Sequence, residues 1–423
     1  MEVLLNSKSK YAVLLLSSVL VIYAIIGGML GRVSAQNGSY QQLSIFMEVL
    51  SRIQNDYVDE PSIKNAINGA IRGLLENVDP YAGYLSPQEV AFYKSYNPYK
   101  TAGIGALIAK RFGYPIIVAV LPGGPAANAK LGTGDMIESI DGVTTREMNI
   151  VQINAVLANP AAKPVALSVI RRRKTEPETV MVNREVAPIP PVEARMVENN
   201  IAYLKVPYLA PGKGDEARKQ LDGLLKKGAT SVILDLRYSA GGEEAEGVQL
   251  ANLFLDSGMI GYLQGQKFEK KLLQANPKDA LTKAPLAVLI NQGTGGASEI
   301  VAGAIADNHR GTLIGVKTFG SGSVQRLMPL ENGSALLLSV AKYYTPSGKE
   351  IQPTEVQLSG IKPTIETLDA ADETLDPNTD DDQEVQTPKA NQQPQVEEDR
   401  QLKKAIEFLR DPIKATKAAK PAA

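Results

Sequence analysis

The stretch between residues 291 and 325 combines glycine-rich turns and a helix start with several hydroxyl side chains. A serine or threonine hydroxyl attacks a carbonyl carbon only when a nearby base removes its proton. The chain has one histidine, His309, and its position between Asn308 and Arg310 is typical of a surface loop residue rather than of a base. The stretch therefore has the small residues of a nucleophilic site without an evident base. The candidate hydroxyls are those of Thr294, Ser298, Ser321 and Ser323.

A second glycine turn, Gly241-Gly242, follows the apolar run at 231–236. A backbone N–H at such a turn can stabilise a tetrahedral oxyanion only if no side chain blocks the approach, a condition that glycine meets. The alternative is a tight strand-to-helix turn that binds no ligand. Turn chemistry alone favours this alternative.

The composition of the 423-residue chain limits its chemistry. Cysteine is absent, which excludes disulfides, thiolate metal sites and a cysteine nucleophile, and no cluster of metal-ligating side chains is visible in the sequence. The net charge is −1, and the basic run at 171–174 is interpreted as a solvated turn. We therefore expect no metal, no cofactor and no nucleic-acid partner, in a chain long enough for two or three domains.

The elements that would position the glycine turns begin with a helical segment at residues 40–100. Apolar residues at helical spacing indicate one helix around 43–57 and a second after Ser62, which can cap it. Another helix is expected to start at Ser86-Pro87. We expect the helical pair to pack on the body of the protein or on a second subunit, which would make a homo-oligomer.

Residues 101–187 change to short strands and one helix, and they resemble a PDZ domain. In such domains a peptide adds a strand beside a strand and a helix, and loop amides hold its terminal carboxylate. The matching loop is Gly103-Ile104-Gly105-Ala106, where glycines let the backbone present N–H groups to an anion. Lys130 stands where such domains usually carry glycine. Strands are expected at 103–110, 115–120, 136–140, 165–170 and 179–182, and a helix at 150–157.

Residues 192–365 follow a proline-rich linker at 187–191 and repeat the order strand, glycine turn, helix. This order predicts an α/β core whose site lies at the carboxyl ends of the strands. The whole chain is therefore expected to be α/β, with an N-terminal helical segment, an inserted PDZ domain and this core. Strands are expected at 201–206, 231–236, 286–290 and 312–315, and helices at 219–227, after Gly242, and at 297–306.

Six stretches from about Phe46 to Thr364 resemble, in order and spacing, the carboxyl-terminal processing (tail-specific) serine proteases. The resemblance implies catalysis by a serine and a desolvated lysine of lowered pKa, which replaces the usual histidine base. The stretches are VDPYAGYLSPQE, the PDZ segment, ILDLRYSAGG, VLINQGTGGASEIVAGAIAD, KTFGSGSVQ and AKYYTPSGKEIQP.

Alignment on the residues ASEI puts Gly296 at the family's nucleophile position and Ser321 at its base position. Gln325 stands where the family's lysine-orienting glutamine sits, and Asp307 where some members have a supporting aspartate. The resemblance assigns the oxyanion hole to Gly241 and Gly242, and it assigns Ser298 to a family serine that caps the helix.

Glycine has no group that can attack a carbonyl, and loss of the serine nucleophile in a hydrolase can cost about 10⁶ in rate. We therefore expect an inactive member of the family that binds protein or peptide C-termini, with an active paralogue as a further candidate partner. One alternative is an active serine-type endopeptidase that uses relocated residues among Thr294, Ser298, Ser321 and Ser323. The other alternative is a cell-envelope scaffold whose old site is not used even for binding.

The two ends of the chain carry different signals. Lys8 and Lys10 precede an apolar run at 11–31, and Val33-Ser34-Ala35 fits a cleavage site, so residues 1–35 are interpreted as a signal peptide or a membrane anchor. The positive-inside rule then places the rest outside the cytoplasm, in the periplasm or its equivalent, with or without an inner-membrane anchor. At the other end, residues 366–398 predict a disordered acidic linker, and 399–423 a short helix and a tail.

Overall fold

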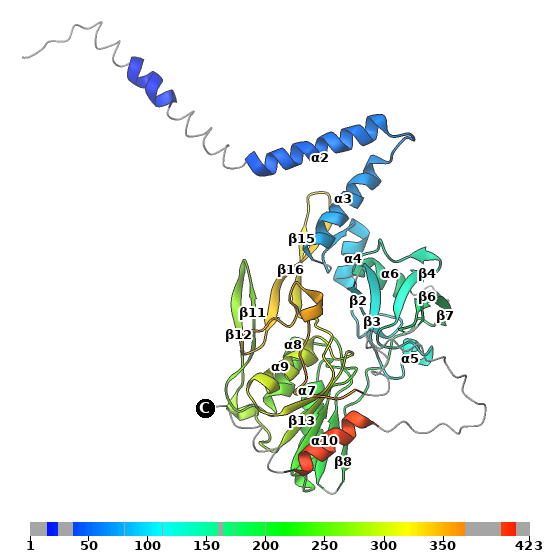
Figure 1. Ribbon diagram of the computed structural model, residues 1–423, viewed down its shortest axis with the longest axis vertical. Coiled ribbons are helices and arrows are strands. Elements are labelled where there is room, and N and C mark those ends of the chain that lie inside the picture. Colours follow the sequence, from blue (N-terminus) through cyan, green and yellow to red (C-terminus); the bar gives the residue numbers. More distant parts are fainter. Residues whose placement is uncertain are drawn as a thin grey trace, which may run out of the picture. The chain divides into compact units, whose positions relative to one another are not determined.

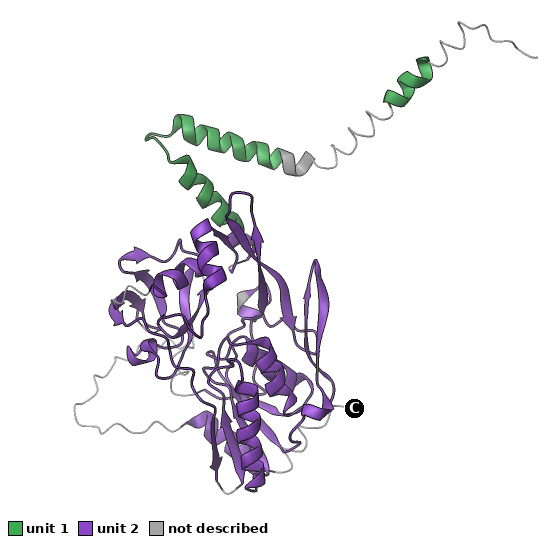
Figure 2. Cartoon of the chain, turned by 180° about the vertical axis from the view of Figure 1, so that it is seen from behind, with its two compact units in different colours: residues 1–74 green, residues 75–423 purple. Residues whose placement is uncertain are grey.

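The computed structural model describes residues 15–23, 37–79, 81–111, 113–159, 164–172, 174–198, 200–368 and 399–411. The chain divides into two compact units, residues 1–74 and 75–423 (Figure 2). The predicted cleavage motif at 33–35, the acidic linker from 369 to 398 and the tail beyond 411 lie outside the described residues. Within the described ranges, no helix is both long enough and apolar enough to span a membrane.

The first unit is helical, as the sequence predicts. Residues 15–23 form a helix, and α2 (Asn37–Asp56) and α3 (Ile63–Val78) follow. The Ser62 hydroxyl accepts a hydrogen bond from the Asn65 amide at 3.4 Å, which fits its expected role as the cap of α3.

The boundary of this unit falls at Leu74, inside α3, and not near residue 100. The reason is that the segment after Leu74 packs within the second unit. Here β1 (Gly83–Leu85) pairs with the distant strand β16 (Ala335–Tyr344). The next helix, α4 (Pro87–Ser95), begins at the predicted cap Ser86, whose hydroxyl accepts the Glu89 amide while the Glu89 carboxylate accepts the Ser86 amide.

The PDZ region is a six-stranded sheet in the order β2-β3-β4-β6-β7, with β5 paired to β4. Strand β6 alternates buried and half-buried residues, which is the period expected of a strand with one face in the core. Asp141 and Gly142 both have positive φ and form the predicted turn. The elements are β2 (Ala106–Arg111), β3 (Tyr114–Val120), α5 (Pro125–Asn128), β4 (Met136–Ile140), β5 (Val143–Thr144), α6 (Ile150–Leu157), β6 (Val165–Ile170) and β7 (Pro177–Val182).

The α/β core contains a sheet in the order β17-β14-β13-β10-β9-β8, in which only β8 is antiparallel to its neighbour. Figure 1 shows α7, α8 and α9 on one side of this sheet and α10 on the other. The elements are β8 (Glu193–Val197), β9 (Ile201–Lys205), α7 (Lys213–Lys226), β10 (Ser231–Asp235), α8 (Glu244–Asn252), β13 (Leu286–Ile290), α9 (Ala297–Asp307), β14 (Thr312–Gly315), β17 (Ile365–Glu366) and α10 (Arg400–Arg410).

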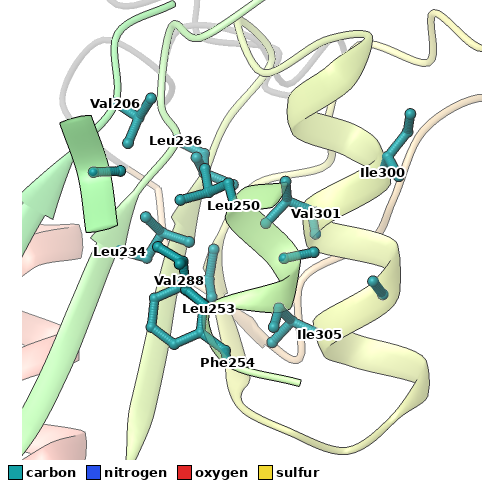
Figure 3. Close-up of a cluster of buried hydrophobic side chains, with 14 of the residues drawn as sticks. Val206, Leu234, Leu236, Leu250, Leu253, Phe254, Val288, Ile300, Val301 and Ile305 are labelled. Carbon is teal, nitrogen blue, oxygen red and sulfur yellow. The ribbon is translucent and has the colours of Figure 1, made fainter. Parts of the chain in front are cut away.

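The main hydrophobic core lies between this sheet and helices α7 to α9 (Figure 3). Leu234 and Val288 from neighbouring strands pack against Leu250, Phe254 and Val301 from the helices, and all five are buried. Burial of one such side chain contributes about 1.5–3 kcal/mol, so this layer fixes the helices on the sheet. It thereby fixes the loops that join each strand to its helix.

A third sheet, in the order β1-β16-β11-β12 with β15 paired to β16, was not predicted from the sequence. Its hairpins join residues within the core segment, but β1 comes from the start of the second unit. The new elements are β11 (Met259–Gly265), β12 (Phe268–Gln274) and β15 (Ser323–Pro329), with short 3₁₀ turns at Pro277–Asp279 and Val356–Leu358.

Candidate functional site

Three loops meet at the carboxyl edge of the parallel sheet, after β10, β13 and β14. Neighbouring parallel strands end at the same edge, so the loops that follow them come together. Two backbone hydrogen bonds join the loops directly: the Gly295 amide donates to the Ser239 carbonyl, and the Phe319 amide donates to the Thr294 carbonyl, each at 2.9 Å. The glycine turns predicted from the sequence are thus assembled in one place.

Gly296, at the predicted nucleophile position, immediately precedes α9 with φ 61° and ψ −121°. A Cβ atom at this residue would lie 3.3 Å from the amide nitrogen of Gly241. A side chain here would therefore start beside the predicted oxyanion hole. Positive φ is the region that L-residues with side chains avoid, at a cost of about 1–3 kcal/mol, so glycine is also the residue that relaxes this turn.

Gly241 and Gly242, the predicted oxyanion glycines, have φ values of 78° and 82°. A Cβ atom at Gly242 would lie 2.5 Å from the Leu209 carbonyl oxygen, so no other residue fits. The Gly242 amide lies against the Tyr208 hydroxyl. The Gly241 amide has no hydrogen-bond acceptor among the described residues, and it is the amide that faces Gly296. The geometry therefore favours Gly241 as the oxyanion donor.

Glu299 brings the nucleophile and base positions together. Its Oε2 accepts hydrogen bonds from the Gly296 amide at 3.0 Å and from the Ser321 amide at 2.7 Å. Its Oε1 accepts the Gly320 amide at 2.6 Å and the Thr318 hydroxyl at 2.5 Å. One carboxylate in the first turn of α9 thus fixes the loop after β14 to the helix start, and it satisfies amides at both positions.

The Glu299 side chain is completely buried, and burial raises its pKa to about 7 although its four hydrogen bonds oppose the shift. We did not predict this role from the sequence. A glutamate three residues after a glycine turn at a helix start is the signal of a side chain that folds back onto the helix N-terminus. Its additional bonds to Gly320 and Ser321 depend on tertiary structure, and the local pattern does not contain them.

Two of the predicted site residues have partners outside the predicted set. Asp307 is at the opposite end of α9 from Gly296, about 16.5 Å away by helical rise, and its carboxylate accepts the Ser347 amide at 2.9 Å. Gln325, on β15, donates from its side-chain amide to the Tyr81 carbonyl at 2.5 Å. Asp307 therefore does not contact the site. The side chain of Gln325 binds Tyr81 rather than Ser321.

The remaining hydroxyls near Gly296 are held in internal hydrogen bonds. The Thr294 hydroxyl is buried and donates to the Leu236 carbonyl at 2.8 Å. The resemblance predicts that Ser298 caps α9. Its buried hydroxyl instead bonds the Ser239 hydroxyl at 2.8 Å. These contacts give both residues structural roles and leave neither beside a base.

Two candidate bases, His309 and Lys317, make no hydrogen bond to these hydroxyls. His309 is exposed in the turn after α9, as expected of a surface residue. Burial lowers the pKa of Lys317, but its ammonium group donates to the Gln357 carbonyl at 2.7 Å. The described residues contain no group of three or more acidic or imidazole side chains that could hold a metal ion.

A cavity of about 370 Å³ joins the PDZ groove to the oxyanion loop. Its walls include Asn154 and Leu157 of α6, the whole of the predicted carboxylate-binding loop, and both Gly241 and Gly242. Within that loop, the Gly103 amide is occupied because it donates to the Glu185 carbonyl at 2.9 Å. The amides of Ile104 and Gly105 have no acceptor among the described residues. These two amides are the ones available to an anion.

Several contacts hold the PDZ region against the core. The Arg111 guanidinium at the end of β2 stacks 3.9 Å from the centre of the Phe319 ring and donates to the Phe319 carbonyl. Leu107 and Val118 pack with Ala240 of the oxyanion loop.

At the edge of the PDZ region, Lys130 has φ 59°, so a lysine adopts the conformation that usually selects glycine there.

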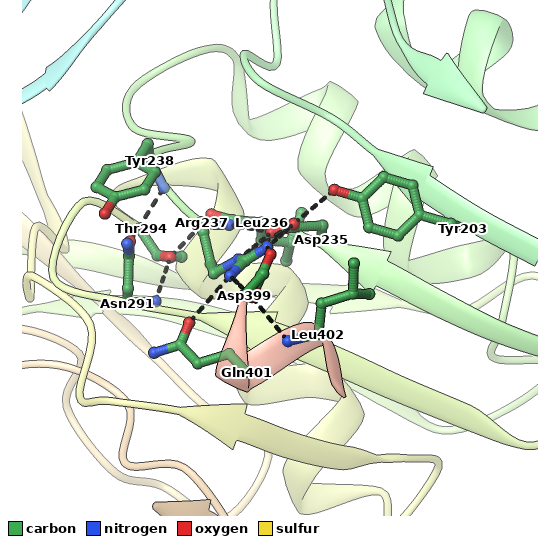
Figure 4. A network of polar contacts seen from close by, with 10 residues as sticks. All are labelled: Tyr203, Asp235, Leu236, Arg237, Tyr238, Asn291, Thr294, Asp399, Gln401 and Leu402. Atoms are coloured by element: carbon green, nitrogen blue, oxygen red, sulfur yellow. Dashed lines mark hydrogen bonds and ion pairs between the residues drawn. The ribbon is translucent and has the colours of Figure 1, made fainter. Parts of the chain in front are cut away.

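A charged network supports the base of the oxyanion loop (Figure 4). Asp235, the last residue of β10, is fully buried and binds the Arg237 guanidinium at 2.6 Å and the Tyr203 hydroxyl at 2.8 Å. Arg237 also pairs with Asp399 at 2.7 Å, and the Asp399 side chain caps α10 through the Leu402 amide. The short helix predicted near Leu402 is therefore present. Its cap, Asp399, forms an ion pair with Arg237, which immediately precedes the oxyanion loop.

Comparison with known proteins gives consistent results along the chain. Residues 200–367 match peptidase family S41, and residues 116–171 match a PDZ domain. The solved structure of a photosystem II D1 C-terminal processing protease has the same fold, with a TM-score of 0.63 at 24% identity, over 76% of this chain and 92% of that one. Together with the sheets and helices described above, this confirms the α/β fold with a PDZ domain that the sequence predicted.

Curated relatives are similar over most of their length. The carboxy-terminal-processing protease of Bartonella bacilliformis is 30% identical over 78% of this chain and 76% of the relative. The carboxy-terminal processing protease CtpA of Bacillus subtilis is 30% identical over 79% and 71%, and the carboxyl-terminal-processing protease of Picosynechococcus sp. is 33% identical over 70% and 72%. From this similarity and the matched segments, the chain belongs to the carboxyl-terminal-processing protease family, peptidase family S41.

Proposed function

We propose that this protein is a catalytically inactive member of the family that binds the C-termini of proteins or peptides. The observation that carries the proposal is the arrangement around Glu299, which binds the amides of both Gly296 and Ser321. The site backbone is organised, but its two key positions supply neither a nucleophile at 296 nor a base at 321.

The cavity supports the binding part of the proposal. A peptide that adds a strand beside β2 would lie between β2 and α6, and its terminal carboxylate would reach the loop at 103–106. The free amides of Ile104 and Gly105 suit a carboxylate in that loop. Because Gly241 lines the same cavity, a bound chain end would lie close to the old oxyanion hole.

Sequence signals support the proposed location. The cationic residues Lys8 and Lys10 before the apolar run at 11–31 support export across the inner membrane, with the run retained as an anchor or removed as a signal peptide. In the cell envelope, the protein would shield or present protein tails, or compete for them with an active paralogue.

The absence of activity is tested directly with the full chain. Incubation with a serine-reactive fluorophosphonate followed by mass spectrometry is expected to give no labelled residue, and an unfolded substrate is expected to remain uncleaved. Labelling of Thr294, Ser298 or Ser321, together with cleavage that disappears when that residue is replaced by alanine, would overturn the proposal in favour of a relocated active site.

The ancestry of the site is tested by restoring it. Gly296→Ser together with Ser321→Lys should place a hydroxyl and an amine on backbone positions that Glu299 already holds together. Each single variant should stay inactive, because a serine needs a base and a lysine needs a hydroxyl to activate, so the effect is strongly non-additive. Activity of the double variant will be limited by the positive φ at residue 296. An inactive, folded double variant would show that the geometry of the site is lost as well.

Binding is tested by titration with one peptide that has either a free or an amidated C-terminus. The free form should bind more tightly, and Gly105→Val should weaken its binding because Gly105 has φ 69° and a Cβ atom there would lie 2.9 Å from the Ala187 side chain. Gly103→Ala is the matched control, since a Cβ atom at Gly103 meets no atom within 4 Å and its amide already bonds Glu185. Equal affinity for the two peptide forms would exclude carboxylate recognition.

A further inference from the structure

A second cavity, of about 340 Å³, lies between the PDZ region and the core and is distinct from the peptide groove. Three cationic side chains line it, and its described lining contains no aspartate or glutamate. None of these three cations lines the groove cavity. The lining residues are Arg111, Ile116, Ile117, Thr133, Gly134, Arg172, Gln292, Lys317, Thr318, Phe319 and Gln357.

Each cation has at least one neutral partner at the cavity. The Arg172 guanidinium donates to the Gln292 side-chain oxygen at 2.6 Å, and its stem crosses Gly134, where a Cβ atom would lie 2.9 Å from the Arg172 Cδ. The Lys317 ammonium group donates to a backbone carbonyl, as described above. Arg111 is held by the Phe319 ring and carbonyl, and it pairs with no carboxylate among the described residues.

Lys317 lies in a positive electrostatic environment. Burial lowers the pKa of Lys317, and the nearby cations Arg111, Lys362 and Lys349 lower it further. Burial also lowers the pKa of Arg111, although Tyr81 and Glu299 oppose that shift. Lys317 therefore lies among like charges, and a bound anion would relieve this repulsion.

We propose that this cavity binds a carboxylate carried by a polypeptide, such as an aspartate or glutamate side chain of a bound protein. Two guanidinium groups and an ammonium group are donors suited to a carboxylate, which arginine can bind through two parallel hydrogen bonds. The apolar wall formed by Ile116 and Phe319 lies beside these cations and suits the aliphatic stem of an acidic side chain better than a bare inorganic ion.

The proposal goes beyond recognition of a C-terminus, because the ligand is an internal acidic residue and the site is a different cavity. Arg111 and Arg172 come from the PDZ region, whereas Lys317 follows β14 of the core. A carboxylate at this place would therefore contact both parts of the second unit. It would give the protein a preference for partners that carry acidic residues.

The test is isothermal titration of the full chain with the blocked peptide acetyl-Glu-Glu-Glu-amide at low salt. This probe has no terminal carboxylate, so it does not depend on the peptide groove. Lys317→Gln and Arg172→Gln should each weaken its binding about tenfold or more, since each removes a charge-assisted hydrogen-bond donor. Lys317→Arg keeps the charge and should retain binding. Salt should weaken binding to the unaltered chain.

Two control variants distinguish binding in this cavity from attraction by net charge and from binding in the peptide groove. Lys278→Gln removes one charge from an exposed turn of the core and should leave affinity unchanged. Gly105→Val should also leave it unchanged, whether or not the proposed groove binds C-termini. An equal loss in Lys278→Gln and Lys317→Gln would overturn the proposal, because it would mean that only net charge matters.

Two further ligands complete the test. Acetyl-Gln-Gln-Gln-amide should not bind, and inorganic phosphate should bind more weakly than the glutamate peptide. Tighter binding of phosphate would overturn the assignment to a polypeptide carboxylate, and so would failure of the glutamate peptide to bind the unaltered chain. Circular dichroism of each variant verifies that a loss of binding is measured on folded protein.

Discussion

Two acidic side chains, Asp235 at the end of β10 and Glu299 in the first turn of α9, are completely buried in the same core. The Asp235 carboxylate is paired with the Arg237 guanidinium, which in turn binds Asp399. The Glu299 carboxylate has no cation in direct contact among the described residues and is bound only by neutral donors. The same fold therefore stabilises one buried acid with a counter-ion and the other with amides and a hydroxyl.

This difference determines which part of the site responds to pH. Burial alone would lower the pKa of Arg237, but Asp235 and Asp399 outweigh it and raise that pKa above its ordinary range, so the network stays charged. Burial outweighs the hydrogen bonds of Glu299 and raises its pKa to about 7. The support under the oxyanion loop is thus fixed, whereas the link between Gly296 and Ser321 changes its charge near neutral pH.

The largest expected effect comes from breaking the paired network. Arg237→Ala leaves Asp235 buried without its counter-ion, and removal of one partner from a buried pair costs about 3–5 kcal/mol of the free energy of unfolding. Urea denaturation measures this loss. The matched control is Arg410→Ala, which breaks the ion pair with Glu198 at the surface and should cost less than about 1 kcal/mol. Similar losses in the two variants would contradict the contrast between a buried and an exposed pair.

The second prediction concerns Glu299 and pH. A carboxyl whose pKa is higher in the folded state than in the unfolded state contributes most stability at low pH, and this contribution is lost as pH rises between the two pKa values. Relative to Glu299→Gln, the unaltered protein should therefore lose roughly 3 kcal/mol of unfolding free energy as pH rises from about 4.3 to about 7. Urea denaturation at several pH values measures the difference, and a constant difference would mean that the pKa is not raised.

The sequence predicted the site to the extent that the site depends on the ends of parallel strands. Gly241, Gly296 and Ser321 follow three strands that the sequence pattern identified, and such loops meet because the strands are parallel neighbours. The role of Glu299 could not be predicted from the local sequence, because two of its donors, the amides of Gly320 and Ser321, come from a different loop.

Other differences have equally specific causes. Asp307 was assigned to the site from the resemblance, but the length of α9 separates it from Gly296. The strands β15 and β16 were not predicted, and β16 is completed by β1, which lies some 250 residues earlier in the chain. From the sequence, Asp399 is predicted only as the start of a short helix. Its pairing with Arg237 needs the chain to return to the core.

The third prediction tests the Tyr203 hydroxyl, which is the uncharged donor in the network around Asp235. Tyr203→Phe removes the hydroxyl that binds Asp235 at 2.8 Å, and a hydrogen bond to a charged group contributes about 1.5–3 kcal/mol. Asp235 keeps Arg237 in this variant, so the loss should be smaller than that of Arg237→Ala. Thermal and urea denaturation both measure it. Tyr344→Phe, which removes a longer bond to the half-exposed Glu350, is the matched control and should cost less.

The smallest expected effect separates the two roles of Asp399. Burial opposes ionisation of this carboxyl, but the hydrogen bond and charge of Arg237 outweigh it and hold its pKa below the usual range. Its side chain is 37% exposed, so solvent reduces the value of the pair. Asp399→Asn keeps a good cap for α10 and removes only the charge, which should cost about 0.5–1 kcal/mol.

Asp399→Ala removes the cap as well and should cost about 1 kcal/mol more than the asparagine variant. The sign of the pH effect gives an independent check. The stability contributed by a carboxyl of lowered pKa is present above its unfolded pKa of about 3.9 and is lost as pH falls through the folded value, which is opposite to Glu299. The asparagine variant should thus differ from the unaltered protein at pH 6 and match it more closely at the lowest pH at which both stay folded. A difference that instead grew with acid would mean that the charge of Asp399 does not depend on Arg237. The contrast between Asp235 and Glu299 would then rest only on the pairing of Asp235 with Arg237.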